Sequence, residues 1–289
     1  MRILVTGASG FIGEPVARRL AAKGHDVLCV CRSPSNVGVG SPVFWDMRDP
    51  EPPCLPSGIE AVAHLAQARN FRRFPENARE IFQVNVAATA TLLDLAVKAG
   101  VQRFVLVSTG TVYEPFSGPL VEDQALNPIA YLGASKLAAE IIARPYAAKL
   151  RLGTVRVFFP YGPGQKDRIV PDLIRRVRNR EAVTIAGSAG GLRLTPTYVD
   201  DVADVIVTAV EQGWTDTCNV AAPHSATVQT VAETIGRLLG REPRFEFVDR
   251  PAPQIVPNLD RLASRYDLNR FISLEEGLRR TLAREPVEI

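Results

Sequence analysis

The chain has 289 residues, enough for one large α/β unit with a smaller appended lobe. Its hydrophobic content of 46% and charged content of 22% are typical of a soluble globular enzyme. The net charge of +3 is too small to indicate a nucleic-acid partner, and no apolar run reaches the roughly 18 residues of a membrane span. The four cysteines lack metal-ligand spacing, and the chain starts on a strand-like segment without a signal peptide. We therefore expect a cytoplasmic protein with no metal, nucleic-acid or membrane partner.

Short apolar segments alternate with amphipathic segments along most of the chain. Strands are expected at residues 3–5, 26–31, 61–65, 104–108, 154–158 and 217–220. Helices are expected at residues 15–23, 83–99, 135–149 and 202–210. This alternation predicts an α/β fold of the Rossmann type, a doubly wound parallel sheet that binds ligands at the carboxyl ends of its strands.

The pattern loosens after residue 160, which predicts a second, smaller domain. We expect a dinucleotide-binding domain over residues 1–160, to which residues 197–222 return. Residues 161–196 and 223–289 are expected to form a small C-terminal substrate-binding lobe. The segments expected to build this lobe are 171–185, 229–247 and 274–282.

A glycine-rich turn joins the first expected strand to the first expected helix. Gly7 permits the tight turn, Gly10 lets the backbone approach a pyrophosphate, and Gly13 allows the helix to pack closely on the strand. The free amides of the helix N-terminus would then face the phosphates. The position between strand and helix predicts a dinucleotide site. Contacts are also expected from the turn residues Ser9, Phe11 and Ile12.

The end of the second strand bears on which dinucleotide is bound. An NAD-preferring site usually has an acidic residue here, which binds the ribose 2′-hydroxyl. In this chain Cys31 holds that place, and Arg32 and Ser33 follow. A guanidinium and a hydroxyl suit a 2′-phosphate, so the sequence favours NADP(H), with NAD(H) possible.

Several further motifs are typical of one enzyme family. They are Asp46-Met47, His64–Ala68, Asn85–Thr89, Ser108–Tyr113, the Gly-x-Ser-Lys136 segment and Tyr161–Gly164. With them, nearly the whole chain resembles an extended short-chain dehydrogenase/reductase of the NAD-dependent epimerase/dehydratase family. The resemblance implies cofactor contacts from Asp46, Met47, Leu65, Ala66, Gln67, Asn85, Lys136 and Phe159. It implies catalytic roles for Ser108, Thr109 and Lys136, and substrate contacts from Thr111, Tyr113 and Tyr161.

The chain departs from this family at the residue that usually moves the substrate proton. The family has a Tyr four residues before the Lys, but here Leu132 stands four residues before Lys136. Tyr131 stands five residues before it, so helical spacing should point Tyr131 and Lys136 in different directions. Leu132 cannot act as an acid or base. Lys136 would still bind the nicotinamide ribose, and Thr109 would orient a carbonyl.

Two other departures concern nucleotide-sugar substrates. Phe159 replaces an Asn that sugar-nucleotide enzymes of the family place after the sixth strand. Leu194 stands where an Arg would bind the diphosphate, with Arg193 one residue away. A nucleotide-sugar substrate would therefore lack several of its expected contacts.

These departures favour carbonyl reduction over sugar oxidation. Oxidation needs a base, whose loss costs about 100- to 10,000-fold in rate, whereas water could supply the proton for a reduction. We therefore predict an NAD(P)H-dependent ketoreductase with a small-molecule carbonyl substrate, similar to the Tyr-less simocyclinone-type enzymes that tailor polyketide antibiotics. Two alternatives stay open. One is a nucleotide-sugar epimerase or dehydratase that uses Tyr131 or another base, and the other is a non-catalytic NADP(H)-binding sensor or scaffold.

One residue bears on assembly. Many family members dimerise through their fourth and fifth helices, and the expected fifth helix of this chain contains Pro145. A proline inside a helix costs about 3 kcal/mol and kinks it. We therefore expect a monomer or an atypical homodimer.

Overall fold

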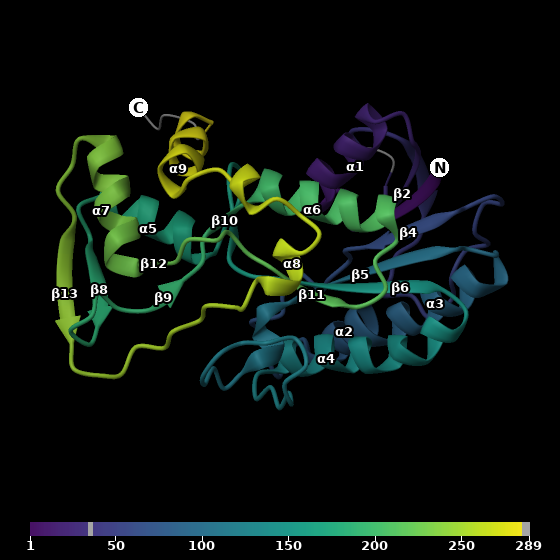
Figure 1. Cartoon of the computed structure of the whole chain (residues 1–289), viewed down its shortest axis with the longest axis horizontal. Coiled ribbons are helices and arrows are strands. Elements are labelled where there is room, and N and C mark those ends of the chain that lie inside the picture. The colour runs from purple at the N-terminus through teal and green to yellow at the C-terminus, as the bar shows by residue number, and fades with distance from the viewer. Residues whose placement is uncertain (34–36, 285–289) are drawn as a thin grey trace. The chain divides into compact units, whose positions relative to one another are not determined.

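The computed structural model describes residues 1–33 and 37–284 (Figure 1). The chain divides into two compact units. The first comprises residues 1–115, 122–157 and 203–219, and the second comprises residues 116–121, 158–202 and 220–289. Residues 285–289 of the predicted lobe lie outside the described residues.

A seven-stranded sheet forms the centre of the first unit, in the order β11-β6-β5-β4-β1-β2-β3. The strands are β1 (Arg2–Thr6), β2 (Asp26–Cys31), β3 (Ser41–Phe44), β4 (Ala61–His64), β5 (Arg103–Thr109), β6 (Arg151–Val157) and β11 (Thr217–Val220). From β6 to β3 in this order, each strand is parallel to its neighbours. This sheet confirms the predicted Rossmann-type α/β fold.

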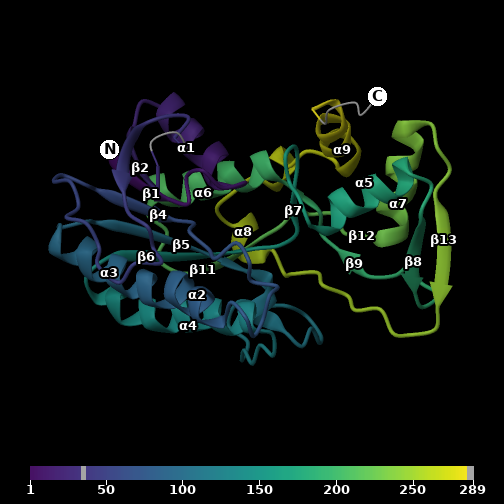
Figure 2. The ribbon, with the colours of Figure 1, turned by 180° about the vertical axis from the view of Figure 1, so that it is seen from behind.

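Helices cover both faces of this sheet, as Figures 1 and 2 show. They are α1 (Gly13–Ala22), α2 (Ala78–Phe82), α3 (Ala88–Lys98), α4 (Tyr131–Ala143) and α6 (Val199–Gln212), the last entering from the second unit. α1 and α6 lie on one face, whereas α2, α3 and α4 lie on the other. The central strands are buried on both faces, which explains why they read as continuous apolar runs rather than alternating ones.

The helical stretch from α2 to α3 contains a π-helix, η2 (Gln83–Ala87). By length and composition alone, Ala78–Lys98 is the one described helix that could cross a membrane. Half of its most apolar 18-residue stretch is buried inside the protein, as expected for a core helix, and Leu92, Leu93 and Ala96 belong to the core of the first unit. The cytoplasmic location stays a prediction.

The second unit has three short strand pairs and several helices. Its strands are β7 (Pro160–Tyr161), β8 (Ala182–Ala186), β9 (Arg193–Leu194), β10 (Thr197–Tyr198), β12 (Ala226–Thr227) and β13 (Arg244–Val248). Its helices are α5 (Ile169–Arg178), α7 (Val228–Leu239), α8 (Asp260–Ala263), η5 (Leu268–Arg270) and α9 (Leu274–Ala283). Its core joins Tyr161, Leu173, Ile185, Val231 and Leu278.

Two details differ from the sequence-based expectations. The α-helix predicted to reach residue 149 ends at Ala143, and Pro145 lies in the first turn of the following 3₁₀-helix η4 (Arg144–Ala148). Proline is tolerated there, so the predicted interior kink is wrong and the argument against a dimer loses its basis. β3 was not predicted, because Ser41 and Pro42 do not read as part of a strand.

Candidate active site

The glycine-rich turn has the close packing that a dinucleotide cradle requires. Gly7 has a φ of +68°, and a Cβ there would lie 2.9 Å from the carbonyl carbon of Leu65. A Cβ on Gly13 would lie 2.0 Å from the Gly7 oxygen. Ile12 holds the N-cap of α1 and makes no side-chain capping hydrogen bond. In the first turn, the Glu14 amide donates to the Gly10 carbonyl at 3.0 Å, and Pro15 has no N–H. These residues fit a bound pyrophosphate.

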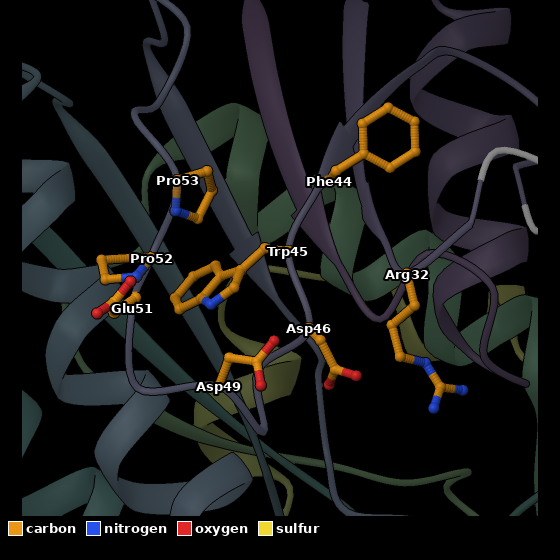
Figure 3. Close-up of a pocket in the computed structure, with 8 residues that line it drawn as sticks. All are labelled: Arg32, Phe44, Trp45, Asp46, Asp49, Glu51, Pro52 and Pro53. Atoms are coloured by element: carbon orange, nitrogen blue, oxygen red, sulfur yellow. The ribbon is translucent and has the colours of Figure 1, made fainter.

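A pocket of about 350 Å³ lies at the carboxyl ends of β2 and β3 (Figure 3). Its lining consists of Arg32, Phe44, Trp45, Asp46, Asp49, Glu51, Pro52 and Pro53. The Arg48 guanidinium holds Asp46 through Nε–Oδ1 and Nη2–Oδ2 contacts of 3.0 and 2.5 Å. The hydrogen bond from Arg48 and, more weakly, the charge of Arg32 keep the pKa of Asp46 below its ordinary value. The pocket presents three carboxylates and one guanidinium.

The remaining predicted cofactor residues of the first unit surround these two features. Ser33 follows Arg32 at the end of β2, while Met47 is buried in the core beside Asp46. Leu65, Ala66 and Gln67 form a half-buried turn after β4.

Asn85 ties this turn to α4. Its Oδ1 accepts the amide of Ala68 at 2.9 Å, and its Nδ2 donates to the Ser135 hydroxyl at 3.0 Å. Ser135 precedes Lys136, so one buried amide side chain holds both a predicted cofactor turn and the helix that carries the lysine.

Lys136 is the buried cation of the site, only 3% exposed. Its Nζ donates to the Val107 carbonyl at 2.6 Å. Burial lowers the pKa of Lys136 from 10.5 to about 8, and the charge of Glu140 only partly offsets this effect. Lys136 can therefore exchange a proton near neutral pH.

Thr109 presents a directed hydroxyl at the end of β5. Its Oγ1 accepts hydrogen bonds from the backbone amide and the hydroxyl of Thr111, both at 3.3 Å. The two acceptor positions of Thr109 are then used, so its own proton can be donated to a ligand oxygen. Gly133 allows α4 to approach this turn, because a Cβ there would lie 2.6 Å from the Thr111 oxygen.

Ser108 and Tyr113 belong instead to a buried polar cluster. The Ser108 hydroxyl donates to Glu140 at 2.5 Å, and Arg156 pairs with the same carboxylate at 2.7 Å. Tyr113 is 2% exposed; its hydroxyl donates to Asn219 at 2.8 Å and accepts from Arg156 at 2.7 Å. The role of Glu140 was not predicted, although its position four residues after Lys136 places it on the same helix face.

The side chains of Tyr131 and Lys136, both on α4, contact different elements, in agreement with the helical spacing. The Tyr131 hydroxyl donates to the Ala78 carbonyl at 3.1 Å, and its ring stacks on Phe74 with centroids 4.8 Å apart. Leu132 stands at the position four residues before Lys136 and supplies only a backbone carbonyl, to Ser135. The tyrosine hydroxyl is thus engaged with α2, while the lysine amine contacts β5.

Two predicted site residues lie in the second unit. Phe159 adopts a φ of +39°, which is strained for a bulky side chain, and packs against the core of that unit. Tyr161 is 1% exposed, its hydroxyl donates to the Leu274 carbonyl at 3.3 Å, and burial raises its pKa. The other predicted site residues all lie in the first unit.

A doubly wound parallel sheet with this glycine-rich turn and a lysine-bearing helix beside β5 defines a dinucleotide-dependent α/β enzyme. The chain belongs to the NAD dependent epimerase/dehydratase family, whose description matches residues 3–221.

Curated relatives match between 66% and 99% of the chain. A UDP-glucuronate 4-epimerase of Thermodesulfobacterium geofontis is 26% identical over 99% of this chain and 97% of its own length. A dTDP-glucose 4,6-dehydratase of Streptomyces griseus is 30% identical over 66% of this chain and 64% of its own length. The structure of MoeE5 in complex with UDP-glucose and NAD is 29% identical, covers 98% of both chains and has a TM-score of 0.82.

These similarities correct the predicted function. The relatives are UDP-sugar epimerases, decarboxylases and related enzymes, so the prediction of a ketoreductase for polyketide antibiotics is wrong. The similar structures hold nucleotide sugars rather than a small aromatic carbonyl compound. They also contain NAD, so the predicted preference for NADP(H) gains no support, while a nicotinamide dinucleotide as cofactor stands.

Proposed function

We propose that this protein oxidises a hydroxyl of a nucleotide sugar with NAD⁺, as the first step of an epimerisation, elimination or decarboxylation. One observation carries the proposal. The glycine-rich cradle, Thr109 and Lys136 lie together in a chain that matches MoeE5, solved with UDP-glucose and NAD, over 98% of its length. The nucleotide-sugar alternative is thereby preferred to the sensor or scaffold, which needs neither Thr109 nor Lys136.

The chemistry explains why one oxidation serves several end products. The cradle at Gly7 and Gly13 would hold NAD⁺, which would supply the hydride acceptor for the sugar carbon. A ketone at C4 allows re-reduction from the other face, elimination of a 6-hydroxyl, or loss of a C6 carboxylate as carbon dioxide from a β-keto acid. The relatives include proteins named as a 4-epimerase, a 4,6-dehydratase and a decarboxylase, so the relatives do not distinguish among these outcomes.

The hydroxyl proton needs an acceptor, and Leu132 cannot be one. The Tyr131 hydroxyl is bound to Ala78 and points away from Lys136. Lys136 has its pKa lowered to about 8 by burial, so its neutral amine is present near neutral pH. We assign Lys136 as the base and Thr109 as the donor that orients the sugar oxygen.

We also propose NAD⁺ rather than NADP⁺ as the cofactor. Asp46 is paired with Arg48, while Asp49 and Glu51 line the same pocket as Arg32. Carboxylates would repel the two negative charges of a 2′-phosphate. Arg32 and Ser33 therefore do not suffice for the NADP(H) selectivity that the sequence suggested.

The test combines cofactor and substrate measurements on the purified protein. Nucleotide released by denaturation is identified, and the rest of the protein is titrated with NAD⁺ and NADP⁺. UDP-glucose, UDP-glucuronate and dTDP-glucose are then incubated with the NAD⁺-loaded enzyme, and products are identified by NMR. We expect tighter binding of NAD⁺ and conversion of at least one sugar. NAD⁺ binding without conversion of any nucleotide sugar would favour the sensor, and NADP⁺ preference would contradict the pocket assignment.

A further inference from the structure

A continuous chain of hydrogen bonds crosses the interior of the first unit beneath the predicted cofactor turns. Thr6 Oγ1 lies 2.6 Å from His64 Nδ1, and His64 Nε2 lies 2.8 Å from Thr89 Oγ1. Thr89 Oγ1 donates to the Asn85 carbonyl at 2.8 Å. Thr6, His64, Asn85 and Thr89 are each at most 1% exposed. The chain thus joins the end of β1 to the end of β4 and to η2.

The two ends of this chain fix the direction of every hydrogen bond within it. At one end, the amides of Leu65 and Ala66 can only donate, and both donate to Thr6 Oγ1 at 3.1 Å. The Leu65 amide also donates to the Thr6 backbone carbonyl at 3.2 Å. Thr6 has both acceptor positions filled and must donate its proton to His64 Nδ1.

At the other end, the Asn85 carbonyl can only accept, so it takes the Thr89 proton. Thr89 must then accept from His64. The ring is therefore neutral, with its proton on Nε2.

A doubly protonated, charged His64 ring cannot keep these hydrogen bonds. A hydrogen on Nδ1 would face the hydroxyl hydrogen of Thr6, because the oxygen lone pairs already accept two amides. Burial, together with the charge of Lys136, lowers the pKa of His64 to about 3. Phe104 packs edge-on to the ring, with centroids 6.1 Å apart.

We propose that His64 is a positioning residue of the dinucleotide site, held as the neutral Nε2–H tautomer so that Thr6 can hold the turn at Leu65 and Ala66. This turn lies directly against Gly7, where a Cβ would contact the Leu65 carbonyl carbon and the Ala66 nitrogen. His64 therefore acts on the cofactor through Thr6 and the turn. The inference rests on the proposed function only in taking a dinucleotide as the ligand of this turn.

The tautomer is tested directly by nitrogen-detected NMR of the histidine-labelled protein. His25 and His224 are the other two histidines, so substitution of each by Gln assigns the His64 signals. We expect a neutral Nε2–H ring whose shifts stay constant between about pH 5 and pH 9, across the ordinary titration range of histidine. An Nδ1–H ring, or titration within this range, would overturn the proposal.

The coupling to the cofactor is tested by Thr89→Val, which removes the acceptor of the His64 proton without changing side-chain shape. Thr91→Val is the matched control, because Thr91 lies on the same helix and donates in the same way to the Ala87 carbonyl at 3.1 Å. Thr89→Ser keeps the hydroxyl and should rescue the wild-type behaviour. We expect Thr89→Val alone to leave the His64 Nε2–H without an acceptor, which disturbs the ring position that Thr6 depends on and weakens NAD⁺ binding about tenfold or more.

The outcomes separate positioning from simple support of the fold. If Thr89→Val and Thr91→Val lower the Tm alike and leave the Kd for NAD⁺ unchanged, His64 is only a core residue and the proposal is wrong. If the wild-type protein fails to bind any dinucleotide, the proposed function fails. The network is then judged by hydrogen exchange at the Leu65 and Ala66 amides, which Thr89→Val should accelerate and Thr91→Val should not. Equal exchange in the two variants would overturn it.

Discussion

The glycine-rich turn and the start of α4 lie in the same unit, yet they differ in how far they keep the family pattern. At the turn, Gly7, Gly10 and Gly13 occupy every expected position. At the start of α4, Leu132 stands four residues before Lys136, where the family resemblance predicts a tyrosine, and the Tyr131 hydroxyl donates to the Ala78 carbonyl. The two regions are separate segments of the chain, so the glycine-rich turn can keep the family pattern while the start of α4 departs from it.

The largest effect is expected at the turn. Gly13→Ala should abolish measurable NAD⁺ binding, because the added methyl group would lie 2.0 Å from a backbone oxygen that cannot move away easily. Gly38→Ala is the control, since a Cβ at Gly38 meets nothing within 4 Å. Binding is measured by calorimetry, with circular dichroism to confirm folding. Wild-type affinity in a folded Gly13→Ala protein would contradict the cradle.

The next effect concerns the residue assigned as the base. Lys136→Met should lower the turnover of a nucleotide sugar by about 100- to 10,000-fold, the usual contribution of a general base. The exposed Lys149→Met provides the control. Steady-state rates are compared at saturating NAD⁺, which separates weak cofactor binding from lost proton transfer. A Lys136→Met enzyme that retains its turnover would exclude Lys136 as the base.

Adding a tyrosine at position 132 tests whether the start of α4 limits turnover. Leu132→Tyr places a phenol four residues before Lys136, on the same helix face. We expect turnover to rise, by up to about 100-fold, with the Kd for NAD⁺ unchanged. Tyr131→Phe, which removes a hydroxyl bound to Ala78, should leave turnover as it is. A rate that falls with Tyr131→Phe would show that Tyr131 takes part in the chemistry after all.

The smallest effect is on stability and follows from the pKa of Lys136. Its pKa is about 8 in the folded protein and near 10.5 when unfolded, so the unfolded chain binds more protons between these values. The free energy of unfolding should therefore rise with pH, by about 2 kcal/mol between pH 8 and pH 10. Urea unfolding at pH 8 and pH 10 measures the rise, and Lys136→Met should lack it. Equal pH dependence in the two proteins would contradict the buried charged lysine.

The parts of the site that were predictable depend on local sequence. The glycine-rich turn is a run of neighbouring residues with defined backbone demands, and the separation of Tyr131 from Lys136 follows from helix geometry alone. Thr6 and His64 are 58 residues apart, and Arg156 lies 16 residues after Glu140. Their pairing depends on which strands become neighbours in the sheet, which no local pattern specifies.

The functional error has a physical cause as well. In the sequence, Leu132 four residues before Lys136 indicates that a base for sugar oxidation is missing. Burial lowers the pKa of Lys136, and this burial appears only in the folded chain. Arg32 and Ser33 by themselves indicate a phosphate site. Asp49 and Glu51 come from a later loop, and only the folded chain shows that they line the same pocket as Arg32.

The central claim is our proposal that this chain oxidises a nucleotide sugar with Lys136, rather than a tyrosine, as the base. The most direct test is to mix the NAD⁺-loaded protein with nucleotide sugars carrying deuterium at C4 and to follow the absorbance of reduced nicotinamide. We predict a reduced-nicotinamide signal whose appearance is slowed by the deuterium and is lost in Lys136→Met. NAD⁺ that stays fully oxidised in the presence of bound nucleotide sugar would contradict the account.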